Sequence, residues 1–258
     1  MTAATGFRKR FLDREELYGS FLKIPATMPA EILGAVGYDF VVVDEEHSPF
    51  NRETTDAIVL ACKAWGIASV VRVQSAQPAA LLSVLDCGAD GVLVPHVDSA
   101  EKARAVVAAC RYRPGSRGFA PTTRAGTFGA EGMEDHIARQ DARVTVIAMI
   151  EDPEAVDRID EILEVEGLDG IFIGRGDLSA AYTGAGKGPE AAAEATRHVL
   201  SAARGRMPAA ILPGSPEDAA DMAAQGVTAF ILSADQGFLK SAAKAALSTI
   251  RGGVGAAR

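Results

Sequence analysis

Polar residues that could carry chemistry follow several short apolar runs of this sequence, each near the point where a run ends. The segment DEEH (44–47) follows one run, Arg72 lies at the end of the next, and Glu151 and Asp177 follow two later runs. Charges scattered at random would not gather so consistently behind apolar runs. These positions are therefore the first candidates for a functional site.

Glu151 and Asp177 form a candidate metal-binding pair. Two carboxylates, with waters completing an octahedron, make a hard oxygen site that suits Mg²⁺ or Mn²⁺, with Co²⁺ and Zn²⁺ as further candidates. The sequence has no HExxH spacing, which argues against a protease-like zinc site. Each carboxylate has an alternative role as a cap of the helix expected to follow it, beginning near Pro153 or Leu178.

His47 and Asp44 form a candidate acid–base pair, because an imidazole oriented by a carboxylate has a pKa suited to proton transfer near neutral pH. The alternative is a loop histidine without a catalytic role. Arg72 lies in an apolar run, where a buried guanidinium needs an anion. That anion is either a substrate carboxylate or enolate, or a structural partner, Glu46 or Asp44. Among the other histidines, only His96 is placed to reach such a site.

Runs rich in β-branched residues alternate with longer Ala-rich stretches along the chain. Several runs are continuously apolar, which is typical of strands buried on both faces. The eight strand candidates are 17–24, 38–44, 68–73, 91–95, 143–151, 169–174, 208–213 and 228–233. The helix candidates between them include 53–65, 77–87, 99–110, 153–165, 190–203, 216–225 and 235–249.

This alternation predicts an α/β protein with one domain over residues 1–258, a single (β/α)8 TIM barrel; an open doubly wound sheet is the alternative. Barrels of this kind carry their active sites at the carboxyl ends of the strands. The polar residues named above would then meet at one rim. One segment, 111–140, interrupts the alternation as a long Gly- and Arg-rich connection. It is either a clamp for an anionic substrate or a solvated surface loop.

Composition narrows the class of protein. With 48% apolar and 23% charged residues among 258, the chain is globular rather than disordered or fibrous. A net charge of −8 argues against nucleic acid as a partner. The three cysteines have no metal-type or CxxC spacing, which favours a reducing compartment. Without a secretory signal or an apolar run of membrane-spanning length, we expect a cytoplasmic protein with no membrane partner.

The order of these motifs resembles a known family. GYDFVVVDEEH, VVRV around Arg72, LLSVLDCGADGVLVPHVDSAEKA, RYRPGSRGF, MIED and VEGLDGIFIGRGDLSA together resemble the HpcH/HpaI family of metal-dependent pyruvate aldolases. The resemblance covers roughly residues 18–240. It implies a (β/α)8 barrel of the phosphoenolpyruvate/pyruvate type. It also implies a homo-oligomer, a hexamer built as a dimer of trimers or a trimer of dimers, in which the last helix packs on a neighbouring subunit.

The activity that the resemblance implies is reversible cleavage of 4-hydroxy-2-oxo acids to pyruvate, or hydroxypyruvate, and an aldehyde, through an enolate stabilised by a divalent metal. Glu151 and Asp177 match the family's metal ligands, and Arg72 matches the arginine beside the pyruvate oxygens. His47 with Asp44 matches the acid–base dyad.

The substrate-binding positions match less completely. The backbone around Gly176 and Asp177 falls where the family holds the pyruvate carboxylate, whereas Met149 stands where glutamine is usual beside the pyruvate. Glu45 stands where glycine is frequent, and Arg175-Gly176 stand where Pro-Ala is frequent. These departures affect the choice of substrate rather than the metal chemistry.

Two functions of other classes are alternatives. One is a CoA ester lyase of the citrate-lyase-β or malyl-CoA type, which shares the two metal-binding carboxylates. The other is a catalytically silent oligomeric barrel, which Met149, in place of the usual glutamine, would favour. Lys23, near the end of the first strand candidate, is the residue that a Schiff-base mechanism would use.

Overall fold

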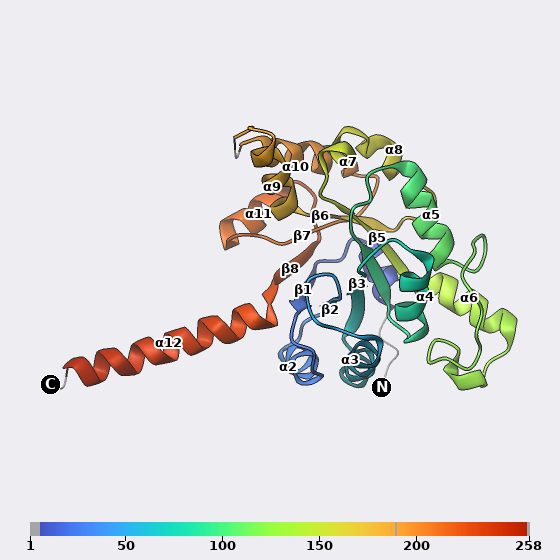
Figure 1. Cartoon of the computed structure of the whole chain (residues 1–258), viewed down its shortest axis with the longest axis horizontal. Helices are drawn as coiled ribbons and strands as arrows, with labels where there is room; N and C mark the ends of the chain where they lie inside the picture. The colour runs from blue at the N-terminus through green and yellow to red at the C-terminus, as the bar shows by residue number, and fades with distance from the viewer. Residues whose placement is uncertain (1–5, 189, 257–258) are drawn as a thin grey trace.

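Eight parallel strands form the centre of the protein, in a computed structural model that describes residues 6–188 and 190–256 (Figure 1). Each strand pairs with its neighbours in sequence, and β1 pairs with β8 to close the barrel. The predicted (β/α)8 barrel is thus confirmed. The strands are β1 (Leu17–Leu22), β2 (Phe40–Asp44), β3 (Ala68–Arg72), β4 (Gly91–Val94), β5 (Thr145–Ile150), β6 (Gly170–Ile173), β7 (Ala209–Ile211) and β8 (Ala229–Ala234).

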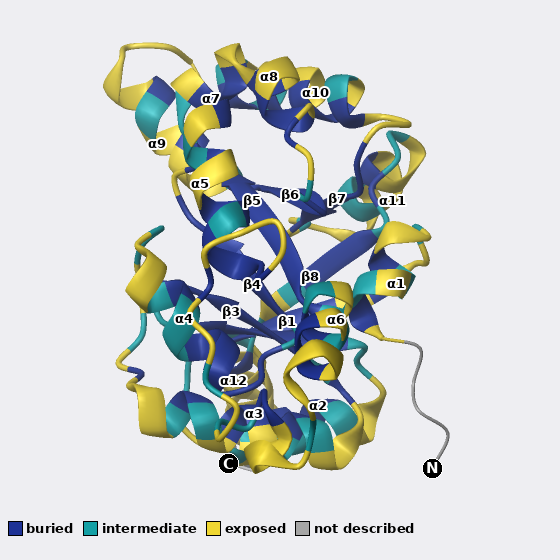
Figure 2. Ribbon diagram, turned by 90° about the vertical axis from the view of Figure 1, so that its right-hand side faces the viewer, coloured by how far each residue is buried: buried dark blue, intermediate teal, exposed yellow. Residues whose placement is uncertain are grey.

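Helices surround the barrel, as expected of strands that are buried on both faces (Figure 2). Asn51, Ser99 and Ser215 cap three of them, each accepting a hydrogen bond from the first turn. The helices are α1 (Phe7–Leu12), α2 (Met28–Val36), α3 (Arg52–Trp65), α4 (Pro78–Asp86), α5 (Ala100–Cys110), the 3₁₀ turn η1 (Thr127–Gly129), α6 (Met133–Arg143), α7 (Pro153–Asp157), α8 (Ile159–Leu163), α9 (Arg175–Gly184), α10 (Glu190–Ala203), α11 (Pro216–Ala224) and α12 (Asp235–Ala256).

Alternate strand residues fill two separate apolar layers. The larger lies between the strands and the helices, and the smaller fills the barrel interior, with Val42, Val70 and Phe172 among its members. Because both faces of each strand are covered, the strands read as continuous apolar runs, which is why all eight were predicted from the sequence.

Helix α1 closes the end of the barrel at which the strands begin. Phe7 and Phe11 are buried in the interior layer, and Phe11 lies so close to Gly170 that a Cβ at that glycine would come within 2.3 Å of the ring. Arg8 pairs with Asp169, just before β6, at 2.8 Å. The carboxyl ends of the strands are therefore the ends available for a functional site.

Two segments differ from the structure that the sequence predicted for them. The helix predicted at 153–165 is divided into α7 and α8 at Arg158, whose φ of −110° and ψ of 18° leave the helical region. The segment 111–140 is shorter as a loop than predicted, because η1 and most of α6 lie within it. Its arginines form ion pairs with carboxylates of the same chain, which argues for a structural loop over a substrate clamp: Arg111 with Asp169, Arg113 with Glu134, Arg117 with Asp86, and Arg124 with Asp56.

Helix α12 extends away from the barrel as a long arm (Figure 1). Leu239, Leu247 and Ile250 are 64%, 51% and 67% exposed along it. Among the described residues, no helix combines the length and apolar character needed to cross a membrane.

Candidate active site

Asp44 and Arg72 form a buried ion pair at the carboxyl ends of β2 and β3. The two residues are register partners in the sheet, so their side chains emerge side by side. Arg72 donates from Nε to Asp44 Oδ1 at 2.9 Å and from Nη2 to Oδ2 at 2.8 Å. Lys23, which follows β1, donates from Nζ to the same Oδ2. This bidentate arrangement fixes the plane of the guanidinium.

Charge and burial have opposite effects on the pKa of the Asp44 carboxyl. Burial alone would raise the pKa of this carboxyl, but hydrogen bonds and charge from Arg72 and Lys23 hold its pKa below the ordinary value. The guanidinium of Arg72 also lies over the ring of Phe21, 4.9 Å from its centroid. Asp44 is therefore ionised and orients Arg72.

His47 lies near Asp44, but its imidazole does not contact that carboxylate. The backbone N–H of His47 donates to Asp44 Oδ1 at 3.2 Å, whereas the ring Nε2 lies 3.7 Å from Glu46 Oε2. The side chain is 55% exposed, so it is accessible to a ligand. The structure thus places Asp44 beside Arg72 and Lys23, and the imidazole beside Glu46.

Glu151 follows β5 and is 2% exposed. Its Oε1 accepts the backbone N–H of His96 at 2.8 Å. His96 has a φ of 54°, a left-handed conformation that costs energy for a residue with a side chain. A Cβ at Gly174, after β6, would lie 2.7 Å from Glu151 Cβ and 3.0 Å from Met149 Cε. Glycine is thus required there for the close packing around Glu151.

Several carboxylates surround Glu151. Burial, with smaller contributions from the charges of Asp177 and Glu46, raises the pKa of Glu151 to about 7, although the backbone N–H and ring of His96 oppose this shift. Glu46 Oε2 is buried without a hydrogen-bond partner among the described residues, and Arg72 Nε lies 3.4 Å from it. Such a concentration of acidic groups fits a divalent cation.

Asp177 lies in the first turn of α9, together with Gly176. The space at Gly176 is open, since no atom lies within 4 Å of the position that a Cβ would take. Free backbone N–H groups at a helix N-terminus attract anions. In the described part of the chain, no three His, Cys, Asp or Glu side chains are grouped closely enough to hold a metal by themselves. Glu151 and Asp177 would therefore leave coordination positions for water or substrate.

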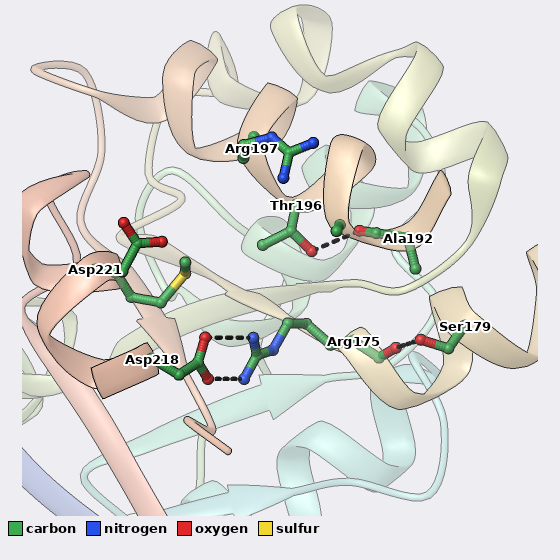
Figure 3. A pocket seen from close by; sticks show the side chains of 9 residues that line it. Arg175, Ser179, Ala192, Thr196, Arg197, Asp218 and Asp221 are labelled. Atoms are coloured by element: carbon green, nitrogen blue, oxygen red, sulfur yellow. Dashed lines mark hydrogen bonds and ion pairs between the residues drawn. The ribbon is translucent and has the colours of Figure 1, made fainter. Parts of the chain in front are cut away.

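The side chains of Met149 and Arg175 lie in two different places beside the site. Met149 is 2% exposed and belongs to the apolar layer inside the barrel, beneath Glu151. Arg175 turns toward α11, where it donates to both carboxylate oxygens of Asp218 at 2.9 and 2.6 Å (Figure 3). It also donates to the Leu212 carbonyl at 2.8 Å. The ion pair borders a cavity of about 370 Å³ between α9, α10 and α11. Arg175 thus connects the first turn of α9, which carries Asp177, to α11.

Three residues join the site beyond the predicted set. Glu46 was expected only as a partner of Arg72, His96 only as a histidine within reach, and Lys23 only as a candidate for Schiff-base chemistry. The ring Nε2 of His96 is 3.9 Å from Glu46 Oε1, and its Nδ1 is 3.1 Å from Asp152 Oδ2. Their positions after three different strands were the available signal.

A closed (β/α)8 barrel with carboxylates, an arginine and two histidines at the carboxyl ends of its strands has the arrangement of a barrel enzyme. A model of the HpcH/HpaI aldolase/citrate lyase family matches residues 18–242, and the chain belongs to this family. The resemblance noted in the sequence is confirmed. This membership makes the chain an aldolase or lyase acting on carbon–carbon bonds. Members of the family generally depend on a divalent metal.

Individual relatives cover nearly the whole chain. A 5-keto-4-deoxy-D-glucarate aldolase of Shigella dysenteriae is 32% identical over 249 residues, which are 95% of this chain and 96% of the relative. The crystal structure of citrate synthase SbnG is 34% identical, with a TM-score of 0.85 over 95% of this chain and 97% of that one. An HpcH/HpaI family protein from Burkholderia cenocepacia is 29% identical, with a TM-score of 0.88 over 95% and 98%.

Proposed function

We propose that this chain is a divalent-metal-dependent aldolase that reversibly cleaves 4-hydroxy-2-oxo acids to pyruvate, or hydroxypyruvate, and an aldehyde. The observation that carries the proposal is the buried Glu151, whose pKa is raised to about 7 with Asp177 and Glu46 contributing. A buried acidic group of this kind binds a cation more readily than it carries an isolated charge. The cation would lie at the same rim as Arg72, which suits a 2-oxo acid.

Glu151 and Asp177 are the residues that would hold the metal in this proposal. Carboxylate oxygens suit Mg²⁺ or Mn²⁺, and Co²⁺ or Zn²⁺ would also bind. When bound, the ion would supply Lewis-acid stabilisation to the developing enolate of the 2-oxo acid. Glu46 stays outside this pair and adds negative charge beside it.

Arg72 would stabilise negative charge on the substrate oxygens. Asp44 takes Nε and Nη2 of the guanidinium, which leaves Nη1 without a partner among the described residues. A guanidinium already fixed in orientation stabilises a developing charge with little reorganisation. Lys23 neutralises the rest of the Asp44 carboxylate, so that carboxylate does not cancel the charge of Arg72.

His47 would move the proton of the aldehyde-derived hydroxyl, directly or through a water. Its ring is 55% exposed and lies 3.7 Å from Glu46 Oε2, so a substrate hydroxyl or a water can reach the imidazole, which supports this role. Asp44 would contribute by holding the His47 backbone and Arg72 rather than by contacting the ring.

The relatives suggest a sugar-derived substrate. Their name, 5-keto-4-deoxy-D-glucarate aldolase, describes an enzyme that acts on an acidic sugar derivative. We extend that substrate class to this chain, with Met149 in place of the usual glutamine as the reason to test other 2-oxo acids as well. The backbone at Gly176 and Asp177 would receive the carboxylate of the pyruvate unit.

A second candidate function is condensation or cleavage involving a CoA ester. The 34% identity to citrate synthase SbnG across 95% of this chain favours it. The same enolate-stabilising groups would serve both reactions, so the two candidates differ in the partner of the enolate rather than in the metal pair.

We also propose that the protein assembles into a homo-oligomer, with a hexamer as the expected form. Helix α12 supports this proposal, since Leu239, Leu247 and Ile250 are exposed on an arm that leaves the barrel (Figure 1). Burial of such residues against a second subunit would remove apolar area from water.

The decisive experiment measures pyruvate release from a panel of 4-hydroxy-2-oxo acids, including 5-keto-4-deoxy-D-glucarate, after chelation and readdition of Mg²⁺, Mn²⁺ or Co²⁺. We expect metal-dependent release that Glu151→Gln abolishes and Glu154→Gln, at an exposed carboxylate nearby, leaves unchanged. Release that persists in chelator would contradict the metal proposal. Consumption of acetyl-CoA with oxaloacetate, without pyruvate release, would favour the second candidate.

A further inference from the structure

A second cluster of charged residues lies at the opposite end of the barrel from the candidate active site. A cavity of about 230 Å³ opens at the amino ends of β2, β3 and β4. Lys63 of α3, Arg10 of α1 and Arg143 of α6 line it together with Asp39 and Asp90. None of these residues belongs to the proposed aldolase site.

The arginines of this cluster all have carboxylate partners. Arg143 pairs with Asp90 at 2.6 Å, and Arg10 pairs with Asp39 at 2.9 Å. Two further arginines nearby, Arg124 and Arg139, pair with Asp56 and Glu131 at 2.6 and 2.5 Å.

Lys63 is the exception. No carboxylate of the described residues lies within 4.0 Å of its amine, and it makes no hydrogen bond to a described side chain or carbonyl. The excess positive charge of the cluster therefore resides on this lysine.

The amine of Lys63 and the guanidinium of Arg143 meet at Gly88. A Cβ built on Gly88 would lie 2.7 Å from Lys63 Nζ, so the amine rests against this backbone. Arg143 Nη2 donates to the Gly88 carbonyl at 3.4 Å. A negatively charged group attached to Nζ would thus lie beside Arg143.

The environment of Lys63 raises the fraction of its amine that is neutral. Burial, followed by the charges of Arg143, Arg124 and Arg139, lowers its pKa to about 8, while Asp90 acts in the opposite direction. At about pH 7.5, roughly one amine in four is then neutral, against about one in a thousand for an ordinary lysine. A neutral amine is a nucleophile, whereas an ammonium is not.

We propose that Lys63 is a carbamylation site, at which the amine reacts with CO₂ to form an anionic carbamate beside Arg143, of whose guanidinium only Nη2 has a hydrogen-bond partner among the described residues. The nitrogen lone pair forms an N–C bond to the carbon of CO₂. One C=O π bond breaks and its electrons pass to oxygen, and the nitrogen releases one proton to water. The reaction replaces the unpaired cation with an anion among Arg143, Arg124 and Arg139. The three added atoms fit within the cavity of about 230 Å³.

The test uses the full-length protein in ¹³C-bicarbonate at about pH 8, where about half of the Lys63 amine is neutral. Carbamates are trapped as ethyl esters with a trialkyloxonium salt, and tandem mass spectrometry locates the label. We expect label on Lys63, its loss in Lys63→Arg, and its retention in Lys102→Arg. Lys102 is the matched control because it pairs with Asp98 at 3.6 Å.

A second variant keeps the lysine and changes its surroundings. Arg143→Gln removes a neighbouring positive charge and frees Asp90, so the amine should become harder to deprotonate and the label on Lys63 should fall several-fold. Undiminished label in this variant would contradict the role given to the arginines. Label spread evenly over the lysines, or an unlabelled Lys63, would overturn the proposal; the latter is the result expected if the site instead binds an inorganic anion.

Discussion

Replacing Asp44 by asparagine tests the reasoning about the buried ion pair most directly. Asp44 is 0% exposed, and its partner Arg72 has a side-chain exposure of 7%. Removing one charge of a buried pair costs about 3–5 kcal/mol. The guanidinium of Arg72 would remain buried with only the longer contact to Glu46, at 3.4 Å, as a counter-charge. Lys23, at 26%, is partly solvated and adds at most about 1 kcal/mol. For a domain of this size, the total corresponds to a fall in the thermal unfolding midpoint of roughly 6–24 °C.

The sign of the pH dependence follows from the lowered pKa of Asp44. A carboxyl whose pKa is lower in the folded state stabilises the fold above its unfolded value of about 3.9, and this contribution is lost as the pH falls through the folded pKa. The difference between wild type and Asp44→Asn should thus be constant near neutral pH and shrink in acid. Differential scanning calorimetry across that range measures it.

The matched control is Asp56→Asn, which breaks a pair with Arg124 in which the aspartate is 40% exposed. An exposed pair contributes about 0–1 kcal/mol, so this variant should unfold close to wild type. If Asp44→Asn is no less stable than Asp56→Asn, or if its deficit persists unchanged in acid, the assignment of a buried, ionised Asp44 is wrong.

Three further predictions concern the proton, the metal and the assembly. His47→Ala should impair aldol cleavage much more than decarboxylation of oxaloacetate, since loss of CO₂ needs no base at a hydroxyl; equal losses in steady-state assays would assign His47 another role. Calorimetric Mn²⁺ affinity should fall by up to about tenfold per pH unit below about 7, because the ion must displace the proton that the raised pKa of Glu151 retains. Glu151→Gln should remove that pH dependence together with most of the affinity. Leu247→Glu combined with Ile250→Glu should yield smaller species in sedimentation velocity, and unchanged sedimentation would exclude these two residues from the interface.

Much of the fold could be predicted from the sequence because a strand buried on both faces has a distinctive composition. The runs that became β2 and β6 contain almost only apolar residues, so their position and length were readable. The division between α7 and α8 was not readable, because Arg158 is an ordinary helix residue and only its backbone angles end the helix.

The sequence predicted where the site lies in the barrel, whereas it left the pairing of Arg72 with Asp44 as one of several alternatives. Strand order places Asp44, Arg72 and Glu151 at one end of the barrel, as expected. Which side chain Asp44 contacts depends on competition among Arg72, Lys23 and His47, and register makes Arg72 its direct neighbour. Spacing along the chain favoured His47 at three residues, but register across strands brought Arg72 closer.

The packing of helix α1 against the start of β6 affects the order in which the protein can fold. Arg8 reaches Asp169 across 161 positions of sequence, and Phe11 packs against Gly170 beside it. During synthesis at about 5–20 residues per second, these partners follow α1 by roughly 8–30 s. Phe7 and Phe11 therefore remain in contact with water, or with a chaperone, until the chain has been synthesised as far as β6. The first helix of the chain therefore cannot take its final position before β6 has been made.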